Sequence, residues 1–196
     1  VGLEATYFHA PPYTSERARE KVIALTRILA RFQGCIRLHI VHFTDVQLAI
    51  YEKCPESQTT VLIRRAMMRI AQRIAAQNGC KALVTGESIG QVASQTLDGL
   101  CCTDAVAEMP VFRPCIGFDK VEIMDRARAV GTYDTSILPY EDCCTIFTPK
   151  HPVTHPRIRD MEISERKIDN YEQLLLDAIE KTEALLITPS PISALG

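Results

Sequence analysis

Short apolar runs alternate with amphipathic stretches along much of the chain. Residues 1–9 form an apolar, β-prone run that Pro11 and Pro12 end. From about Thr14 to Gly34, apolar residues recur at three- and four-residue steps while arginines stay off that stripe. The stripe consists of Val22, Leu25, Leu29 and Phe32. The pattern predicts a strand followed by a helix that packs this stripe against a core.

The same alternation continues to about residue 131. Further strands are expected at Ile36–Val41, Lys81–Thr85 and Met109–Arg113. Helices are expected at 44–53 with Thr44 as cap, at 58–78, at 92–97, and at 119–131 between an Asp119–Glu122 capping box and Gly131. Beyond Thr132 the pattern changes to prolines and one amphipathic helix near 170–186. Alternating strands and helices predict an α/β fold with a doubly wound, mostly parallel sheet, whose ligands bind at the C-terminal strand ends.

Composition narrows the classes of function. The chain has 196 residues, 46% hydrophobic and 23% charged, which suits one ordinary domain and excludes general disorder. A net charge of −2 argues against a wholesale nucleic-acid coat, although 22 lysines and arginines leave room for a local basic face. No apolar run is long enough to span a membrane, and residues 1–15 lack the pattern of a signal peptide. We therefore expect a cytoplasmic protein without membrane partners.

The chain has eight cysteines, four of them in the vicinal pairs Cys101–Cys102 and Cys143–Cys144. Adjacent cysteines rarely bridge each other without strain, which leaves buried thiols, metal ligands or redox-active thiols. A zinc site built from these pairs with His151 and His155 is not favoured, because no Cys-x-x-Cys occurs and prolines surround both histidines. No resident metal is predicted.

The segment Thr85–Gln91 is predicted to connect a strand to a helix. Backbone N–H groups at such a turn favour an anion, and Gly86 and Gly90 permit close approach by a ligand. A plain turn without a ligand explains the spacing equally well, because neither standard glycine-rich phosphate loop occurs in the chain.

The long helix predicted at 58–78 has arginines on one side, at Arg65, Arg69 and Arg73. The opposite side is apolar and is expected to face the core. Such an arginine stripe is either a solvated face or a set of contacts to RNA phosphates. Arg64 lies off both stripes and is the better candidate for a ligand contact.

The string Pro139–Thr145 places two carboxylates directly before Cys143 and Cys144. Adjacent negative charge raises the pKa of a thiol, so a thiolate here would need compensation from a cation such as Lys150 or His151. A structural thiol, a redox thiol and a carboxylate site for magnesium all remain open on these residues alone.

Three long strings together carry a resemblance to a known family. They are Tyr7–Arg17, Leu83–Leu97 and Tyr140–Pro149. In this order they strongly resemble the tRNA 4-thiouridine synthetases, or tRNA sulfurtransferases, called ThiI, which are also linked to thiamine biosynthesis. The resemblance runs from Val1 to about Leu186 and leaves residues 187–196 as a tail.

The resemblance implies a PP-loop ATP pyrophosphatase domain, which is adenine nucleotide alpha hydrolase-like. Such an enzyme uses ATP and Mg2+ to adenylate a uridine of tRNA, and sulfur then comes from a persulfide donor such as a cysteine desulfurase. The matched nucleotide positions are Tyr7, Phe8, Arg64, Gly86 and Gln95. Cys143, rather than Cys144, matches the cysteine proposed to resolve the persulfide.

The chain also departs from the family pattern. It lacks the Ser-Gly-Gly-x-Asp-Ser phosphate loop with its strand, the N-terminal tRNA-binding region and a rhodanese-like domain. We therefore expect part of a longer enzyme, inactive alone, with an open sheet edge that favours a homodimer. The alternatives are a non-catalytic RNA- or partner-binding module and a PP-loop enzyme that acts on a thiamine precursor protein.

Overall fold

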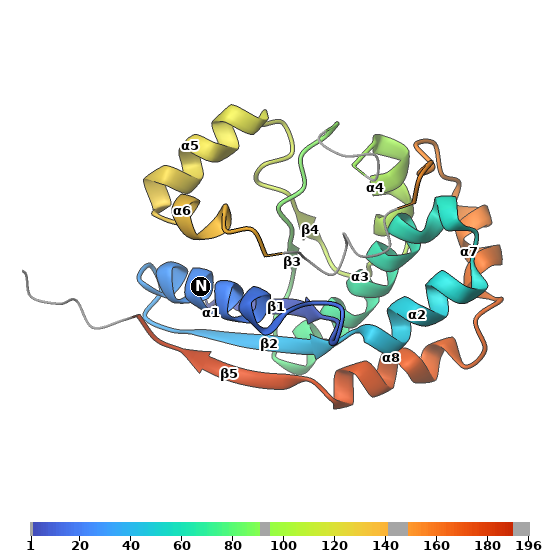
Figure 1. Ribbon diagram of the computed structural model, residues 1–196, viewed down its shortest axis with the longest axis horizontal. Helices are drawn as coiled ribbons and strands as arrows, with labels where there is room; N and C mark the ends of the chain where they lie inside the picture. The colour runs from blue at the N-terminus through green and yellow to red at the C-terminus, as the bar shows by residue number, and fades with distance from the viewer. Residues whose placement is uncertain (1, 91–94, 141–148, 190–196) are drawn as a thin grey trace, which may run out of the picture.

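Two small β-sheets pack against one long helix, α3 (Thr59–Gln77), in the computed structural model, which describes residues 2–90, 95–140 and 149–189 (Figure 1). The predicted bounds of this helix are therefore correct to within a residue. Its buried residues include Ile63, Ile70 and Ile74, as the apolar side of the pattern predicts.

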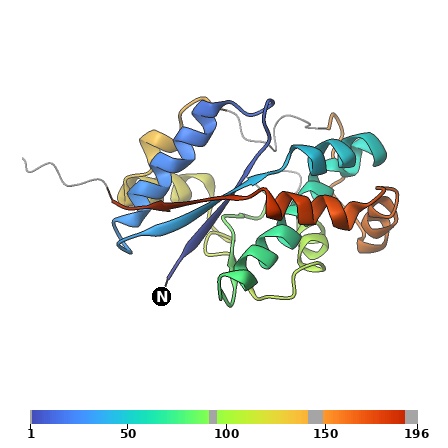
Figure 2. The same cartoon turned by 90° about the horizontal axis from the view of Figure 1, so that it is seen from below.

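The larger sheet has three strands in the order β1 (Glu4–His9), β2 (Ile36–His42) and β5 (Glu183–Ile187). β1 and β2 are parallel, with Tyr7 beside Ile40, and β5 is antiparallel to β2. Alternate residues of β2 serve opposite faces of the sheet, because successive side chains of a strand point to opposite sides. Figure 2 shows α1 (Glu16–Ala30) on one face of this sheet and α3 on the other.

The smaller sheet pairs β3 (Leu83–Val84) with β4 (Val111–Phe112) in parallel. The parallel pairings agree with the predicted mostly parallel α/β fold. The described residues form two separate sheets, however, where one doubly wound sheet was expected.

The C-terminal part of the chain corrects a second expectation. Helix α8 (Tyr171–Glu180) ends before residue 186, and the chain continues into β5. Ile187, expected to begin the tail, is buried as the last residue of that strand. Leu185 and Ile187 of this strand pack beside Leu38 and Ile40 of β2.

The remaining helices lie around the two sheets. They are α2 (Thr44–Lys53), a 3-10 turn (Glu56–Gln58), α4 (Leu97–Asp104), α5 (Lys120–Val130), α6 (Tyr133–Ser136) and α7 (Ile158–Glu165). In the described ranges, no helix is both long enough and apolar enough to cross a membrane.

Several helix ends follow signals in the sequence. Asp119 and Glu122 form the predicted capping box of α5 with two N–H···O bonds of 2.9 Å, and Gly131 ends the helix at φ +83°. Thr44 does not cap α2, since Phe43 holds that position and the Thr44 hydroxyl donates to the carbonyl of Pro11 at 2.7 Å.

The inner face of α1 also differs from the prediction. Leu29 and Phe32 are exposed, whereas Ala18, Thr26 and Ala30 are buried against the sheet. These small residues recur at a spacing of four or eight, which lets the helix lie close to the strands. Val22 contributes to both patterns and packs beside Leu38 and Ile40.

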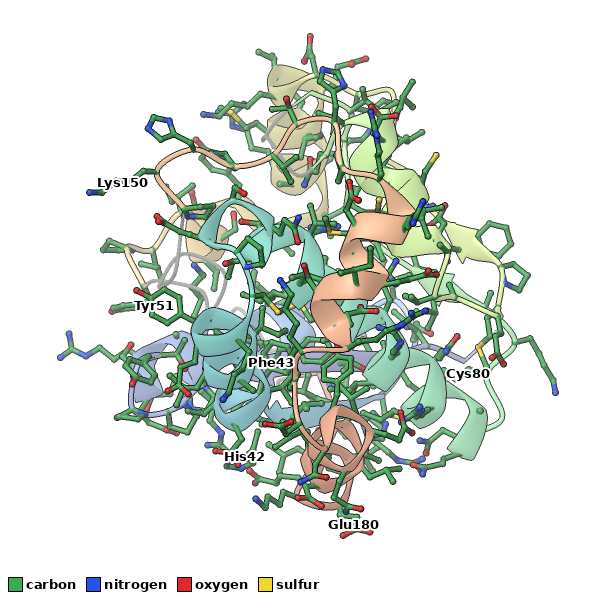
Figure 3. The ribbon with its side chains drawn as sticks, turned by 90° about the vertical axis from the view of Figure 1, so that its right-hand side faces the viewer. His42, Phe43, Tyr51, Cys80, Lys150 and Glu180 are labelled. Carbon is green, nitrogen blue, oxygen red and sulfur yellow. The ribbon has the colours of Figure 1, made fainter. Side chains whose placement is uncertain are left out.

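The main core lies between the larger sheet and helices α2, α3, α7 and α8. Its fully buried side chains include Phe43, Ile50, Leu62, Met161 and Leu175. In Figure 3, Phe43 lies inside this core, whereas Tyr51, Lys150 and Glu180 lie toward the outside. The core therefore fixes α3, which carries residues of the candidate site.

Candidate functional site

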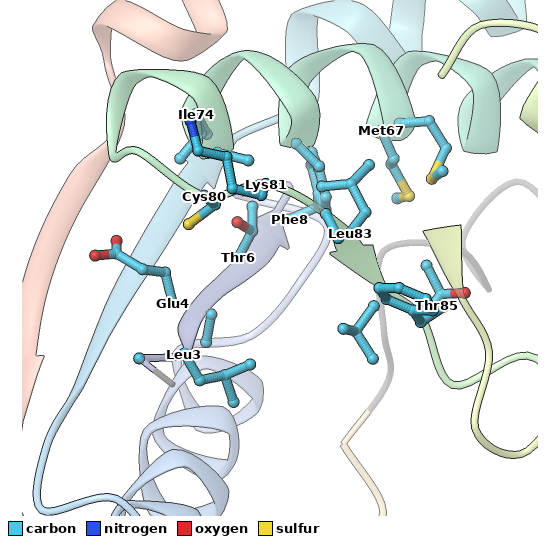
Figure 4. A pocket seen from close by; sticks show the side chains of 18 of the residues that line it. Leu3, Glu4, Thr6, Phe8, Met67, Ile74, Cys80, Lys81, Leu83 and Thr85 are labelled. Atoms are coloured by element: carbon cyan, nitrogen blue, oxygen red, sulfur yellow. The ribbon is translucent and has the colours of Figure 1, made fainter. Parts of the chain in front are cut away.

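A groove of about 800 Å³ lies between β1 and β3 (Figure 4). Thr6 and Phe8 line it from β1, Leu83 from β3, and Met67 and Ile74 from α3. Most of this lining is apolar. β1 pairs only with β2, and β3 only with β4, among the strands that the structure describes. Both strands therefore present an unpaired edge in this region.

Tyr7 and Phe8, both matched by the resemblance to nucleotide positions, serve opposite faces of the sheet. Phe8 lines the groove and packs edge-on against Phe43, with 5.2 Å between ring centroids. Tyr7 packs on the α1 side, and its hydroxyl lies 3.4 Å from Nδ1 of His9. Of this matched pair, Phe8 is the residue that meets the groove.

His9 ends β1 in a buried hydrogen-bonded turn. Its Nδ1 shares a hydrogen bond of 2.9 Å with the hydroxyl of Thr14, which also accepts from the N–H of Ala10. Burial lowers the pKa of His9, and Glu16 opposes that change. His9 is thus a packing residue at the end of the strand.

The Gly86 turn follows β3 directly. Apart from its chain neighbours, a Cβ placed on Gly86 would meet no atom of the described residues within 4 Å. The N–H of Ser88 donates to Oε1 of Gln95 at 3.2 Å, and the N–H of Gly90 donates to the Gln95 carbonyl at 3.0 Å. Gln95, one of the predicted site residues, is therefore bonded to the turn that contains another, Gly86, through Ser88 and Gly90.

Glu87 connects this turn to Arg64. Its carboxylate is buried and forms ion pairs with Arg64, at the groove, and with Arg113, at the end of β4. Thr85 donates a further hydrogen bond of 2.8 Å to it. Asp104, the last residue of α4, pairs with the same Arg113.

The sequence reasoning missed Glu87 and Arg113. The available signal was a lone carboxylate between the glycines of an otherwise neutral turn, which has to find a cation once the turn is buried. No local pattern pointed to Arg113.

Helix α4 follows the Gly86 turn in the chain. Helix α4 starts at Leu97, where Thr96 accepts from the N–H of Gly99 at 3.1 Å. Residues 92–94 of the predicted helix at 92–97 lie outside the described residues, and the described helix α4 begins at the last residue of that range.

The arginine stripe of α3 packs against α7 and α8. Arg65 is buried and donates to both carboxylate oxygens of Glu165 at 2.7 and 3.0 Å, and to the carbonyl of Cys102 at 2.6 Å. Neither alternative for the stripe, a solvated face or a contact to RNA, applies to Arg65, because its guanidinium is buried and each of its three nitrogens donates within the chain.

Arg69 and Arg73 are more exposed members of the same stripe. Arg69 also donates to both oxygens of Glu165, at 2.6 and 3.0 Å, and Arg73 pairs with Glu172 at 2.7 Å. RNA contact by these two arginines stays a prediction, and it would have to compete with their internal carboxylates.

Glu165 accepts four of these hydrogen bonds. Burial raises the pKa of Glu165, but the hydrogen bonds and charges of Arg65 and Arg69 outweigh it, so the pKa lies below its usual value. The carboxylate is therefore held ionised at neutral pH.

Some of the cysteines lie in the described residues and others do not. Cys143 and Cys144 lie outside the described residues. Cys101 is exposed, whereas Cys102 is buried and burial raises the pKa of its thiol. His155 pairs with Asp98 at 2.8 Å.

Comparison with known proteins decides the family. The family model for "Thiamine biosynthesis protein (ThiI)" matches residues 1–170, which is most of the chain. The chain belongs to the ThiI family. ThiI relatives named "Probable tRNA sulfurtransferase" include those of Lachnospira eligens and Acetivibrio thermocellus. They are 56% and 57% identical over 188 residues, which covers 95% and 96% of this chain.

A solved structure resembles the ThiI fold found here. It is described as "Crystal structure of a 4-thiouridine synthetase - RNA complex with bound ATP", and it matches with a TM-score of 0.91 at 42% identity. The match covers 95% of this chain and 49% of that chain. Both ThiI relatives above are covered over 48% of their own length. The chain thus spans about half the length of the relatives it matches.

Proposed function

We propose that these residues form part of the PP-loop ATP pyrophosphatase domain of a tRNA sulfurtransferase that makes 4-thiouridine. The observation that carries the proposal is the meeting of Arg64, the Gly86 turn and Gln95 in one place beside an apolar groove. These are the positions that the resemblance matches to the nucleotide site. The similar 4-thiouridine synthetase was crystallised with RNA and ATP, which supports the same substrates here.

In the proposed reaction, the uridine oxygen bonds to the α-phosphorus of ATP and pyrophosphate leaves. The terminal sulfur of a protein persulfide then replaces that oxygen, which departs with AMP. Cys143 attacks the persulfide and forms a disulfide with the cysteine that carried the sulfur, so the uridine receives sulfur at the sulfide level. A cysteine desulfurase or another persulfide donor supplies the sulfur, and the reaction takes place in the cytoplasm. The same sulfur chemistry would serve thiamine synthesis.

Arg64 supplies positive charge at this site, and Phe8 supplies an aromatic surface at the groove. Positive charge stabilises the developing negative charge on phosphate oxygens. Mg2+ accompanies ATP in the proposal, but Glu87 is occupied by two arginines and Glu4 by Arg37 and His39. We therefore assign no step to the metal.

Arg64→Ala tests the nucleotide assignment. We expect ATP affinity, measured by isothermal titration, to fall about tenfold with the loss of one charged contact. The test uses the protein encoded by the longest natural reading frame that contains these residues. Arg128→Ala is the matched control, because Arg128 is exposed on α5 and pairs with Asp125 three residues away. Equal affinities for both variants and the wild type would contradict the role of Arg64.

Cysteine variants in the same reading frame test the sulfur step. We expect Cys143→Ser to abolish formation of 4-thiouridine. Adenylation, measured by the release of pyrophosphate, should continue. Cys144→Ser should retain both activities. The reverse result would move the role to Cys144.

The unpaired edges of β1 and β3 favour a second candidate function, a non-catalytic partner-binding module. An apolar groove between two strands, each with one edge that is unpaired among the described strands, can accept a further strand, including one from a second copy in a homodimer. We expect the 196-residue chain alone to produce no AMP from ATP and to dimerise in analytical ultracentrifugation. AMP production by the pure chain would contradict its proposed inactivity, and a monomer at high concentration would exclude the homodimer.

A further inference from the structure

We propose that Glu87 is a positioning residue that holds the Arg64 guanidinium in place for the nucleotide. The inference rests on the proposed function, since it assigns a role toward the same ligand. It adds a residue that the family resemblance did not supply and that the contacts of this structure single out.

Four side chains of alternating charge form a series of ion pairs that includes Glu87 and joins four elements. Asp104 at the end of α4 pairs with Arg113 after β4, Arg113 pairs with Glu87 after β3, and Glu87 pairs with Arg64 on α3. The Nε of Arg113 lies 2.5 Å from Oε2 of Glu87, while Arg64 binds through Oε1. Each carboxylate oxygen of Glu87 therefore serves a different arginine.

The burial of Glu87 makes this arrangement rigid. Its side chain is 5% exposed, compared with 47% for Asp104 at the far end of the set. Thr85 donates a third bond to Oε2, which fixes the carboxylate relative to the end of β3. A buried carboxylate with three donors has few alternative orientations, and it limits Arg64 in the same way.

Arg64 retains access to a ligand in this position. Its side chain is 22% exposed and contributes to the wall of the groove, while the Nη2 atom is directed to Glu87. A long arginine side chain has many rotamers in the absence of a partner, so fixing one of them reduces the entropy lost on binding. We infer that Glu87 contributes to nucleotide affinity through Arg64, without touching the nucleotide.

A structural salt bridge would show the same contacts, so the test must separate the two roles. A double-mutant cycle does so, because an effect that passes through Arg64 disappears when Arg64 is removed. The proteins are the wild type, Glu87→Gln, Arg64→Ala and the double variant, each in the longest natural reading frame. Asp125→Asn, at an exposed pair on α5, is the control.

The measurement is the dissociation constant of ATP, with melting temperature recorded for each protein. We expect Glu87→Gln and Arg64→Ala each to weaken binding about tenfold. The double variant should bind no more weakly than Arg64→Ala, and Asp125→Asn should bind as the wild type does. Thr85→Val is a milder second variant if Glu87→Gln fails to fold, and we expect it to weaken binding about threefold only where Arg64 is present.

Each other outcome has a definite meaning. Equal losses from Glu87→Gln with and without Arg64 would overturn the positioning role, as would unchanged affinity in Glu87→Gln. A loss in Glu87→Gln combined with none in Arg64→Ala would leave a nucleotide site but refute action through Arg64. Failure of the wild type to bind ATP would overturn the proposed function itself, and this inference with it.

Discussion

Replacement of Glu165 by glutamine should strongly destabilise the fold, although the two side chains have nearly the same shape. Glu165 accepts four hydrogen bonds from Arg65 and Arg69. Glutamine offers one oxygen, and its NH₂ group would face guanidinium N–H donors at the other position. Arg65 would then be a buried cation without a carboxylate, since its side chain is only 1% exposed.

The expected loss follows from two estimates that agree. Removing one partner of a buried ion pair costs about 3–5 kcal/mol. Two lost hydrogen bonds to charged groups, at about 1.5–3 kcal/mol each, give a similar range. For a chain of this size the loss lowers the melting temperature by about 6–20 °C. Urea denaturation followed by circular dichroism measures the free energy directly.

Glu172→Gln, on α8, is the matched control at another arginine of the same α3 stripe. Glu172 pairs with Arg73, but its side chain is 64% exposed, so we expect a loss below about 1 kcal/mol. A double replacement, Arg65→Met with Glu165→Leu, should cost less than Glu165→Gln, because the fully buried charge of Arg65 is removed together with its partner and only the more exposed Arg69 loses a carboxylate. Equal effects of Glu165→Gln and Glu172→Gln would refute the assignment of a buried, stability-determining ion pair.

Three further predictions concern pH and helix ends. Because the folded-state pKa of Glu165 is lowered, its contribution to stability is complete above its unfolded pKa and is lost as pH falls through the folded pKa; urea midpoints between pH 7 and pH 2 should show a smaller acid loss in Glu165→Gln, and identical profiles would contradict this. Asp119→Ala removes the capping box of α5 and should cost about 1 kcal/mol in urea denaturation, while Lys120→Ala should cost much less. Gly131→Ala forces a side chain into φ +83° and should cost about 1 kcal/mol; a stabilised variant would show that this end of the helix rearranges freely.

Local chemistry explains the parts of the fold that the sequence predicted well. The capping box of Asp119, the left-handed Gly131 and the apolar side of α3 depend on residues within a few positions of one another. Such signals can be recognised within a short stretch of sequence. The predicted bounds of α3 are likewise correct to within a residue at each end.

Long-range pairing explains the parts that were missed. Arg65 and Glu165 are 100 positions apart, so the stripe was interpreted as a surface although its partner lies on α7. Glu87 and Arg113 are 26 positions apart, and each looks unremarkable in its own segment. The antiparallel β5 depends in the same way on a partner strand far away in the sequence, whereas periodicity alone extended the preceding helix through it.

Helix α3 packs against both sheets, and this packing limits how such chains can vary in length. One side of the helix carries Arg64 and the apolar wall of the groove, and another carries Arg65 toward Glu165. One inserted residue would rotate everything after it by about 100° about the helix axis. Arg64 would then lose its fixed relation to Met67 and Ile74. We therefore expect natural variants to gain or lose residues outside 59–77 and to keep the spacing within that range constant.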